Sequence, residues 1–223
     1  MRRPIQLLKA ATPTGRLINR TAAKVLKEMR QNGIDAIQER LKDSSEIAVK
    51  YLEVDWHVRH VVREAARLNL LSSPPLRVLD IGCGTGSFLY VLRSVGHKVF
   101  GLDLGDSEVY NEMIEFLKLP RIIHRISKFQ RLPEFEAKLD LITAYSVCFD
   151  MHHCDEVWGP EEWAFFLMDC QARLKSGGRI FLNFNPATNQ PFDFIPDSVA
   201  EMLRNLPGAR LSASREFFTL HCA

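Results

Sequence analysis

One stretch of the 223-residue chain, Val78–Ser87, reads VLDIGCGTGS. It begins as a largely apolar run of strand length, and glycines then occupy every second position at 82, 84 and 86. Glycine adopts backbone angles that side chains disfavour and lets a ligand approach the backbone closely. A strand that feeds such a loop and then a helix is typical of ligand binding in doubly wound sheets. The alternative interpretation is an ordinary tight turn between a strand and a helix.

The residues around this stretch alternate between strand and helix patterns. Strands are predicted at 76–81, 98–104, 122–126, 139–145 and 179–185, and one or two short strands at 209–222. Helices are predicted at 88–95, 107–117, 161–174 and 198–206, after N-terminal helices at 18–31, 34–41 and 54–71. The pattern predicts an α/β fold with a doubly wound, mostly parallel Rossmann-like sheet of six to seven strands and helices on both of its faces.

The spacing of acids and glycines narrows the choice of ligand. A dinucleotide-binding loop has its third glycine five places after the first, but that place is Ser87 here, and the third glycine is Gly86. Asp103 ends the next predicted strand, 21 residues after Gly82. A carboxylate at that place accepts hydrogen bonds from the ribose hydroxyls of an adenosine. Asp103 therefore indicates an adenosine, and the early third glycine argues against a nicotinamide cofactor.

The pattern D-x-G-x-G-x-G from Asp80 to Gly86 resembles motif I of the class I S-adenosylmethionine-dependent methyltransferases, and the resemblance extends over about residues 76–186. It implies S-adenosylmethionine as the cofactor, with carboxylates suited to its ammonium and sulfonium groups. In this family an acid often follows the third strand near the adenine, but Lys128 stands there, which leaves Phe129 or Ser127 as the adenine contact or Phe129 as core packing. The cofactor-binding residues that the resemblance implies are Asp80, Gly82, Cys83, Gly84, Gly86, Asp103, Leu104, Phe129 and Tyr145.

The loop after the fourth predicted strand carries the candidate catalytic residues. The resemblance places the methyl acceptor above the end of this strand, where the sequence is rich in titratable side chains. His152, His153 or Tyr145 would act as a general base, with Asp150 as another candidate; the alternative for each histidine is a surface or capping role. His152–Glu156 are metal-ligand types, but they are adjacent and lack the spacing of a zinc site, so no metal site is predicted, and metal-dependent O-methylation is kept as an alternative.

The N-terminal part of the chain differs in charge from the rest. Residues 1–30 hold eight basic residues and one acid, whereas the whole chain carries only +2, so the remainder is acidic at −5. We expect three regions: a basic arm or helix at 1–30, a helical lid at 31–73, and the cofactor-binding domain at 74–223. In the lid, Tyr51 or Arg59 would reach the carboxylate of the cofactor. The arm has several open interpretations: a solvated extension, a contact to nucleic acid or a membrane surface, or an organelle transit peptide.

The composition sets the remaining expectations. An odd number of cysteines without a C-x-x-C pair favours a reducing compartment, and we expect a cytoplasmic protein. No run of eighteen apolar residues occurs, so no transmembrane segment is predicted. The leading hypothesis is methyl transfer from S-adenosylmethionine to a small-molecule or lipid-linked acceptor. The alternatives are an RNA or protein methyltransferase that uses the basic arm, a non-catalytic module that binds S-adenosylmethionine, and a nicotinamide oxidoreductase. The sequence carries no signal for an oligomeric state.

Overall fold

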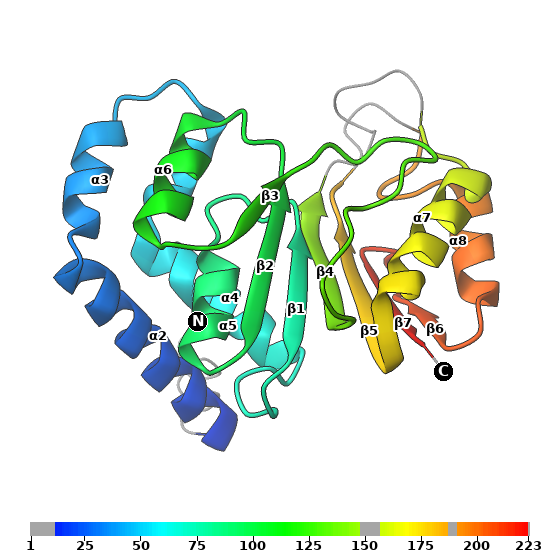
Figure 1. The fold of residues 1–223 in the computed structure, drawn as a ribbon, viewed down its shortest axis with the longest axis horizontal. Coiled ribbons are helices and arrows are strands. Elements are labelled where there is room, and N and C mark those ends of the chain that lie inside the picture. The colour runs from blue at the N-terminus through cyan, green and yellow to red at the C-terminus, as the bar shows by residue number, and fades with distance from the viewer. Residues whose placement is uncertain (1–11, 148–156, 187–190, 223) are drawn as a thin grey trace, which may run out of the picture. The chain divides into compact units, whose positions relative to one another are not determined.

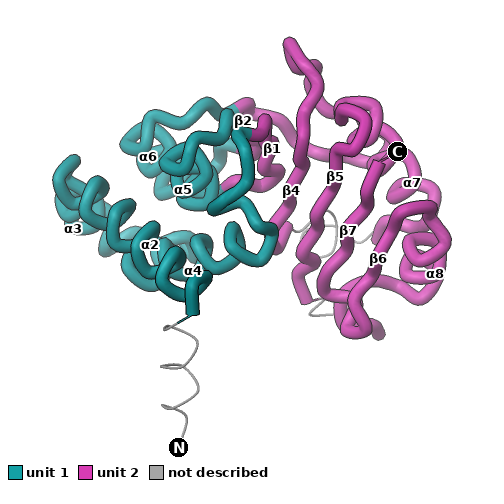
Figure 2. The backbone as a smooth tube through the Cα atoms, turned by 90° about the horizontal axis from the view of Figure 1, so that it is seen from below, with its two compact units in different colours: residues 1–75, 84–99, 105–121 teal, residues 76–83, 100–104, 122–223 magenta. Residues whose placement is uncertain are grey.

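The computed structural model describes residues 12–147, 157–186 and 191–222 (Figure 1). Its contacts divide the chain into two compact units (Figure 2). Unit 1 comprises residues 1–75, 84–99 and 105–121, and unit 2 comprises residues 76–83, 100–104 and 122–223. The chain passes between the units several times, and one of these passages, at Cys83 and Gly84, lies inside the glycine-rich loop.

The seven strands form one sheet in the order β3-β2-β1-β4-β5-β7-β6. Strand β4 pairs in parallel with both β1 and β5, while β7 runs antiparallel to β5 and β6. This arrangement confirms the predicted α/β fold and its mostly parallel Rossmann-like sheet, with an antiparallel hairpin at one edge. The strands are β1 (Arg77–Ile81), β2 (Lys98–Asp103), β3 (Arg121–Ile123), β4 (Leu139–Val147), β5 (Leu174–Phe184), β6 (Ala209–Leu211) and β7 (Phe217–His221).

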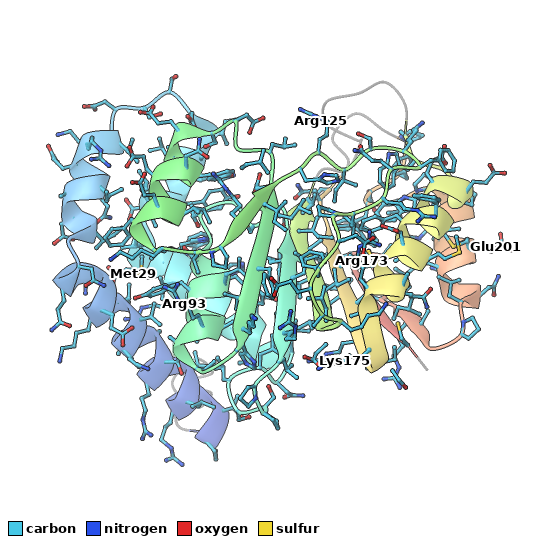
Figure 3. The ribbon with its side chains drawn as sticks, viewed as in Figure 1. Met29, Arg93, Arg125, Arg173, Lys175 and Glu201 are labelled. Atoms are coloured by element: carbon cyan, nitrogen blue, oxygen red, sulfur yellow. The ribbon has the colours of Figure 1, made fainter. Side chains whose placement is uncertain are left out.

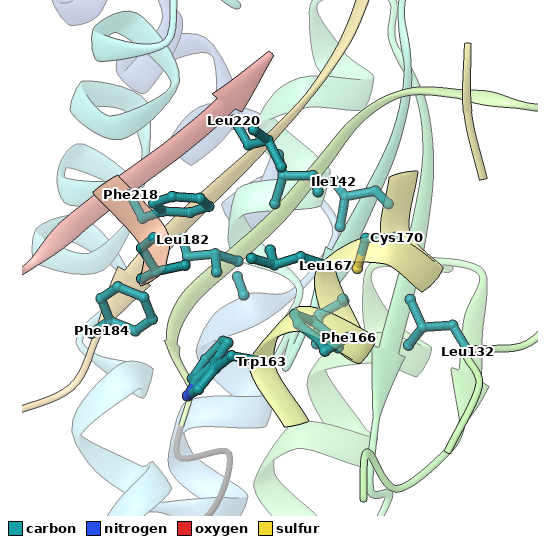
Figure 4. Packing of buried hydrophobic residues seen from close by; sticks show 14 of the residues in the cluster. Leu132, Ile142, Trp163, Phe166, Leu167, Cys170, Leu182, Phe184, Phe218 and Leu220 are labelled. Carbon is teal, nitrogen blue, oxygen red and sulfur yellow. The ribbon is translucent and has the colours of Figure 1, made fainter. Parts of the chain in front are cut away.

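The core of unit 2 lies between one face of the sheet and two helices, α7 (Pro160–Arg173) and α8 (Asp197–Asn205). The rings of Trp163 and Phe184 meet edge to face, with centroids 5.4 Å apart (Figure 4). Each such apolar side chain contributes about 1.5–3 kcal/mol when it is fully buried. Because strand side chains alternate between faces, Leu79 and Ile81 join this core, and Asp80 between them belongs to the opposite face of β1.

Unit 1 is built from helices. They are α2 (Pro13–Gln31), α3 (Ile34–Leu41), the 3₁₀ helix η1 (Ile47–Leu52), α4 (Val54–Arg67), α5 (Ser87–Ser94) and α6 (Glu108–Phe116). The apolar stripes of α2 and α4 pack against each other, and α4 also packs against α5. Arg93 of α5 donates to the carbonyls of Leu117 and Lys118 at 2.6 and 2.7 Å, which ties α5 to the segment after α6 (Figure 3). Among the described residues, no helix has the length and apolar character needed to cross a bilayer.

The predicted elements are all present, with shifted ends. The last predicted N-terminal helix ends at Arg67 instead of residue 71, because the chain turns through Asn69 at a φ of 60°. Strand β3 ends at Ile123 instead of residue 126. Strand β5 begins five residues before its predicted start, at Leu174, which pairs with Leu139 of β4; Gly177 and Gly178 also exchange hydrogen bonds with Cys222 beyond β7. The extension of β5 comes from contacts between segments that are distant in the chain, which local periodicity does not encode.

Candidate functional site

The glycine-rich loop connects β1 to α5, and its backbone requires glycine. Gly82, Gly84 and Gly86 have φ values of 67°, 52° and 71°, a left-handed region that other residues adopt at a cost. Space is also lacking: a Cβ at Gly82 would lie 2.5 Å from Cγ2 of Val147 in unit 2, and one at Gly86 would lie 2.5 Å from Cδ1 of Leu119 in unit 1. At Gly82 and Gly86, both the backbone conformation and the lack of space for a Cβ therefore require glycine.

In unit 2, the start of the loop is attached to the end of β2. The amides of Gly82 and Cys83 both donate to the carbonyl of Leu102, at 2.7 and 3.2 Å. Asp103 follows directly, as the last residue of β2, and its carboxylate accepts the amide of Leu104 at 2.7 Å. The half-buried Asp103 and the partly exposed Leu104 thus lie at the carboxyl end of β2, next to the first loop residues. Ligands of doubly wound sheets bind at this edge.

Asp80 is a second acid of unit 2, and it is buried, with 3% of its surface exposed. Its carboxylate accepts a hydrogen bond from Oγ1 of Thr143 at 2.6 Å, across the β1–β4 pair. The pKa of Asp80 is raised to about 7, mainly by burial; the Thr143 hydrogen bond lowers it and the negative charge of Asp103 raises it, and the value is the net result of these effects. The carboxyl of Asp80 therefore exchanges its proton near neutral pH, and a nearby cation favours its charged form.

Phe129 follows β3 and is 54% exposed, so it does not serve as core packing. Its backbone is left-handed, with a φ of 57°, and the edge of its ring meets Phe165 of α7 at a centroid distance of 5.7 Å. Hydrogen bonds to α7 hold the segment that follows. Asp169 accepts the amide of Leu132 at 2.8 Å, and Arg173, labelled in Figure 3, donates from Nε to the carbonyl of Pro133 at 2.9 Å. Both α7 side chains are buried and form an ion pair of 2.6 Å.

The other predicted residues of unit 2 lie at or after the end of β4. Tyr145 is half-buried, and its ring lies 5.3 Å from that of Phe181 on β5. His152, His153 and Asp150 lie outside the described residues. Within the described part of the chain, no group of three or more His, Cys, Asp or Glu side chains is arranged to hold a metal ion.

In unit 1, the second half of the loop lies against residues of the predicted lid region. Oγ1 of Thr85 is 3.3 Å from Nε2 of His57 on α4 and 3.0 Å from Oγ of Ser87. Burial lowers the pKa of His57 to about 4, with a smaller contribution from His60, so the imidazole is neutral at physiological pH. The Tyr51 ring lies 4.9 Å from that of His57. The predicted lid residues Tyr51 and His57 therefore gather beside the loop within this unit.

Sequence reasoning missed several residues around the loop. Thr143 and Leu102 contact the site residues but belong to no recognised motif, and Thr85 stands at a variable position of the glycine-rich motif. Tyr110 of α6 was also missed; its Cζ lies 3.5 Å from the place of a Cβ at Gly84. Thr143 did carry a signal, because a polar residue in an apolar interior strand needs a partner. For Tyr110 the helical pattern gave none.

Comparisons with known proteins complete the description of the site. The family model described as a methyltransferase domain matches residues 55–220. A search of curated proteins returned no match. Among solved structures, DesVI from Streptomyces venezuelae is similar with a TM-score of 0.50 and 12% identity, over 74% of this chain and 92% of that one. A TehB-like SAM-dependent methyltransferase from Corynebacterium glutamicum gives a TM-score of 0.48 and 17% identity, over 71% and 86% of the two chains. Magnesium protoporphyrin IX methyltransferase from Synechocystis, with bound SAH, gives a TM-score of 0.47 and 18% identity, over 84% of this chain and 94% of that one.

Proposed function

Because this chain belongs to the methyltransferase-domain family and is a class I enzyme that uses S-adenosylmethionine, we propose that it methylates a small-molecule or lipid-linked acceptor. One observation carries the cofactor part of the proposal: three left-handed glycines form a loop whose first amides bind the end of β2, next to Asp103. The charge of the chain supports the acceptor class, because residues 31–223 carry a net charge of −5, which is unfavourable for binding a polyanion.

The residues of the loop region suit the chemistry of the cofactor. Asp103 would accept the two ribose hydroxyls, and the exposed ring of Phe129 would stack on the adenine. Asp80 would stabilise the cationic methionine end once its carboxyl is ionised. The proposed cofactor-binding set is therefore the predicted one: Asp80, Gly82, Cys83, Gly84, Gly86, Asp103, Leu104, Phe129 and Tyr145.

The bound cofactor supplies a methyl group that is already activated by its sulfonium. The protein has to align an acceptor in line with the methyl–sulfur bond, exclude water and, for a hydroxyl or protonated amine, remove a proton. Tyr145, at the end of β4, and His152 and His153 in the loop that follows are our proposed candidates for this base. The proposed organisation is a basic arm at 1–30, a lid at 31–73 and a cofactor-binding domain at 74–223.

Calorimetric titration with S-adenosylmethionine and S-adenosylhomocysteine tests the cofactor part, and we expect both to bind at micromolar concentration, within the usual range for enzyme substrates. The absence of binding at millimolar concentration would refute it. Transfer of radiolabel from methyl-labelled S-adenosylmethionine into fractionated small-molecule and lipid extracts tests the acceptor class. Label that enters only RNA or protein would refute the small-molecule proposal.

A second candidate, methylation of RNA or protein, is favoured by the outer face of α2. Arg16, Arg20, Lys24 and Lys27 recur at helical spacing and are exposed, opposite the buried stripe of the helix. Replacement of Arg16, Arg20 and Lys27 by glutamate should abolish salt-dependent RNA binding if this face holds RNA. RNA affinity that the replacements leave unchanged, or that is absent from the unmodified chain, would exclude the role.

A further inference from the structure

Strand β4 carries an irregularity at its end. Tyr145 pairs with Asn183 of β5, but Val147 pairs with Phe184, so two steps along β4 match one step along β5. Ser146 is the extra residue, and its φ is 51°. A residue other than glycine with this backbone is strained, and strained bulges are found where a strand has to redirect a side chain.

Two amide side chains of the β5 end hold this bulge. Oγ of Ser146 donates to Oδ1 of Asn183 at 3.0 Å, and Nδ2 of Asn185 donates to the carbonyl of Ser146 at 2.6 Å. Asn183 also donates from Nδ2 to the carbonyl of Glu216, just before β7, at 3.5 Å. Asn183, near the end of β5, and Asn185, directly after Phe184, thus fix the hydroxyl and the carbonyl of the strained residue.

The residue after the bulge contacts the glycine-rich loop within unit 2. Cγ2 of Val147 occupies the space beside Gly82 so closely that a Cβ there would lie only 2.5 Å away. The amide of Gly82 is fixed from another direction by the carbonyl of Leu102. Val147 therefore supports the first turn of the loop, and its place depends on the bulge at Ser146.

We propose that Asn183 and Asn185 are positioning residues for cofactor binding: they hold the β4 bulge at Ser146, and the bulge holds Val147 against Gly82. This inference rests on the proposed cofactor site. It assigns the amides a role at a distance from the ligand, through the backbone of β4, and it distinguishes them from residues that touch the cofactor.

A double-mutant cycle with titration of S-adenosylhomocysteine tests the proposal. We expect Asn185→Ala to raise the Kd about tenfold, equivalent to about 1.4 kcal/mol. Ser146→Gly alone should leave the Kd within about twofold, because glycine adopts the left-handed backbone without strain. The double variant should regain most of the lost affinity, since glycine no longer needs the amide to hold it. Asn205→Ala, which removes an exposed amide at the end of α8, is the matched control and should change nothing.

Two results would overturn the proposal. If Asn185→Ala lowers the melting temperature but leaves the Kd unchanged, the bulge is a structural feature alone. If Ser146→Gly does not restore the affinity of Asn185→Ala, the amide acts in some other way. Should Asn185→Ala fail to fold, Val147→Ala takes its place: a weaker Kd supports the contact with Gly82, and an unchanged Kd refutes it. If the wild-type chain does not bind S-adenosylhomocysteine, the proposed function is refuted, and the role of the amides is refuted with it; loss of affinity in the variants alone concerns only the amides.

Discussion

Thr143 donates a hydrogen bond of 2.6 Å to Asp80, and the two residues face each other across the β1–β4 pair although 63 positions separate them in the chain. The contact keeps a buried carboxyl partly satisfied beside the glycine-rich loop. Burial still raises the pKa of Asp80 to about 7. The carboxyl of Asp80 is therefore mostly protonated below pH 7 and mostly ionised above it, and only the ionised form attracts a cation bound beside the loop.

The affinity for S-adenosylhomocysteine should rise with pH as Asp80 ionises. Between pH 6 and 8 we expect the Kd to fall by up to about tenfold per pH unit below 7 and then to level off, because the ammonium group of the ligand favours the carboxylate. Calorimetric titration across this range measures the effect.

Two variants identify Asp80 as the source of this pH dependence. Asp80→Asn should bind weakly at every pH in the range. Thr143→Val should move the midpoint above 7, because the lost hydrogen bond is the contribution that lowers the pKa. A pH profile in Asp80→Asn identical to that of the wild type would assign the titration to another group.

Replacement of Asp103 should weaken the cofactor directly. Asp103→Ala removes a carboxylate that would accept two ribose hydroxyls, and we expect a loss of affinity of about 10- to 100-fold. Asp106→Ala, which removes an exposed carboxylate three residues later, is the control and should bind like the wild type. Equal effects of the two variants would mean that charge alone matters, and no effect of Asp103→Ala would refute the ribose contact.

Gly86→Ala should destabilise the fold more than Gly96→Ala. Both glycines have positive φ values, of 71° and 103°, so alanine is strained at each. At Gly96 no atom lies within 4 Å of the added Cβ, and the strain alone costs about 1–2 kcal/mol. At Gly86 the added Cβ would lie 2.5 Å from Leu119 and 2.7 Å from Ile114, which adds about 1–3 kcal/mol for overpacking. Urea denaturation measures both free energies of unfolding, and equal losses would show that α5 moves to accept the methyl group.

His57 should make the fold sensitive to acid. Its folded-state pKa of about 4 lies below the ordinary value of 6.5, so the folded chain binds fewer protons than the unfolded chain between these values. The stability that His57 contributes is therefore present above pH 6.5 and is lost as the pH falls toward 4. His57→Gln removes this titration, and the difference in unfolding free energy between wild type and variant should change sharply over that window. His221→Gln, at an exposed histidine, should leave the pH dependence of the wild type in place, and a flat difference for His57→Gln would contradict the assignment.

Local sequence patterns were enough to predict the order of strands and helices, the glycine-rich loop between the first strand and its helix, and the place of Asp103 at the end of the next strand. These features are local, because each is encoded within a few residues. They are an apolar run, three glycines spaced two residues apart, and an acid at the end of a strand. Where a predicted end differs from the observed one, a contact between distant segments can be the cause. In β5, for example, Gly177 donates a hydrogen bond to the carbonyl of Cys222.

Tertiary structure alone decided which side chains meet at the loop. Thr143 reaches Asp80, His57 reaches Thr85, and the bulge at Ser146 brings Val147 onto Gly82 through pairs of residues 63, 28 and 65 positions apart. The raised pKa of Asp80 likewise follows mainly from burial, which no local sequence pattern reports. A periodic pattern shows which face of an element is apolar, but it does not show which element packs against that face. The partner depends on how all the elements of the fold pack together.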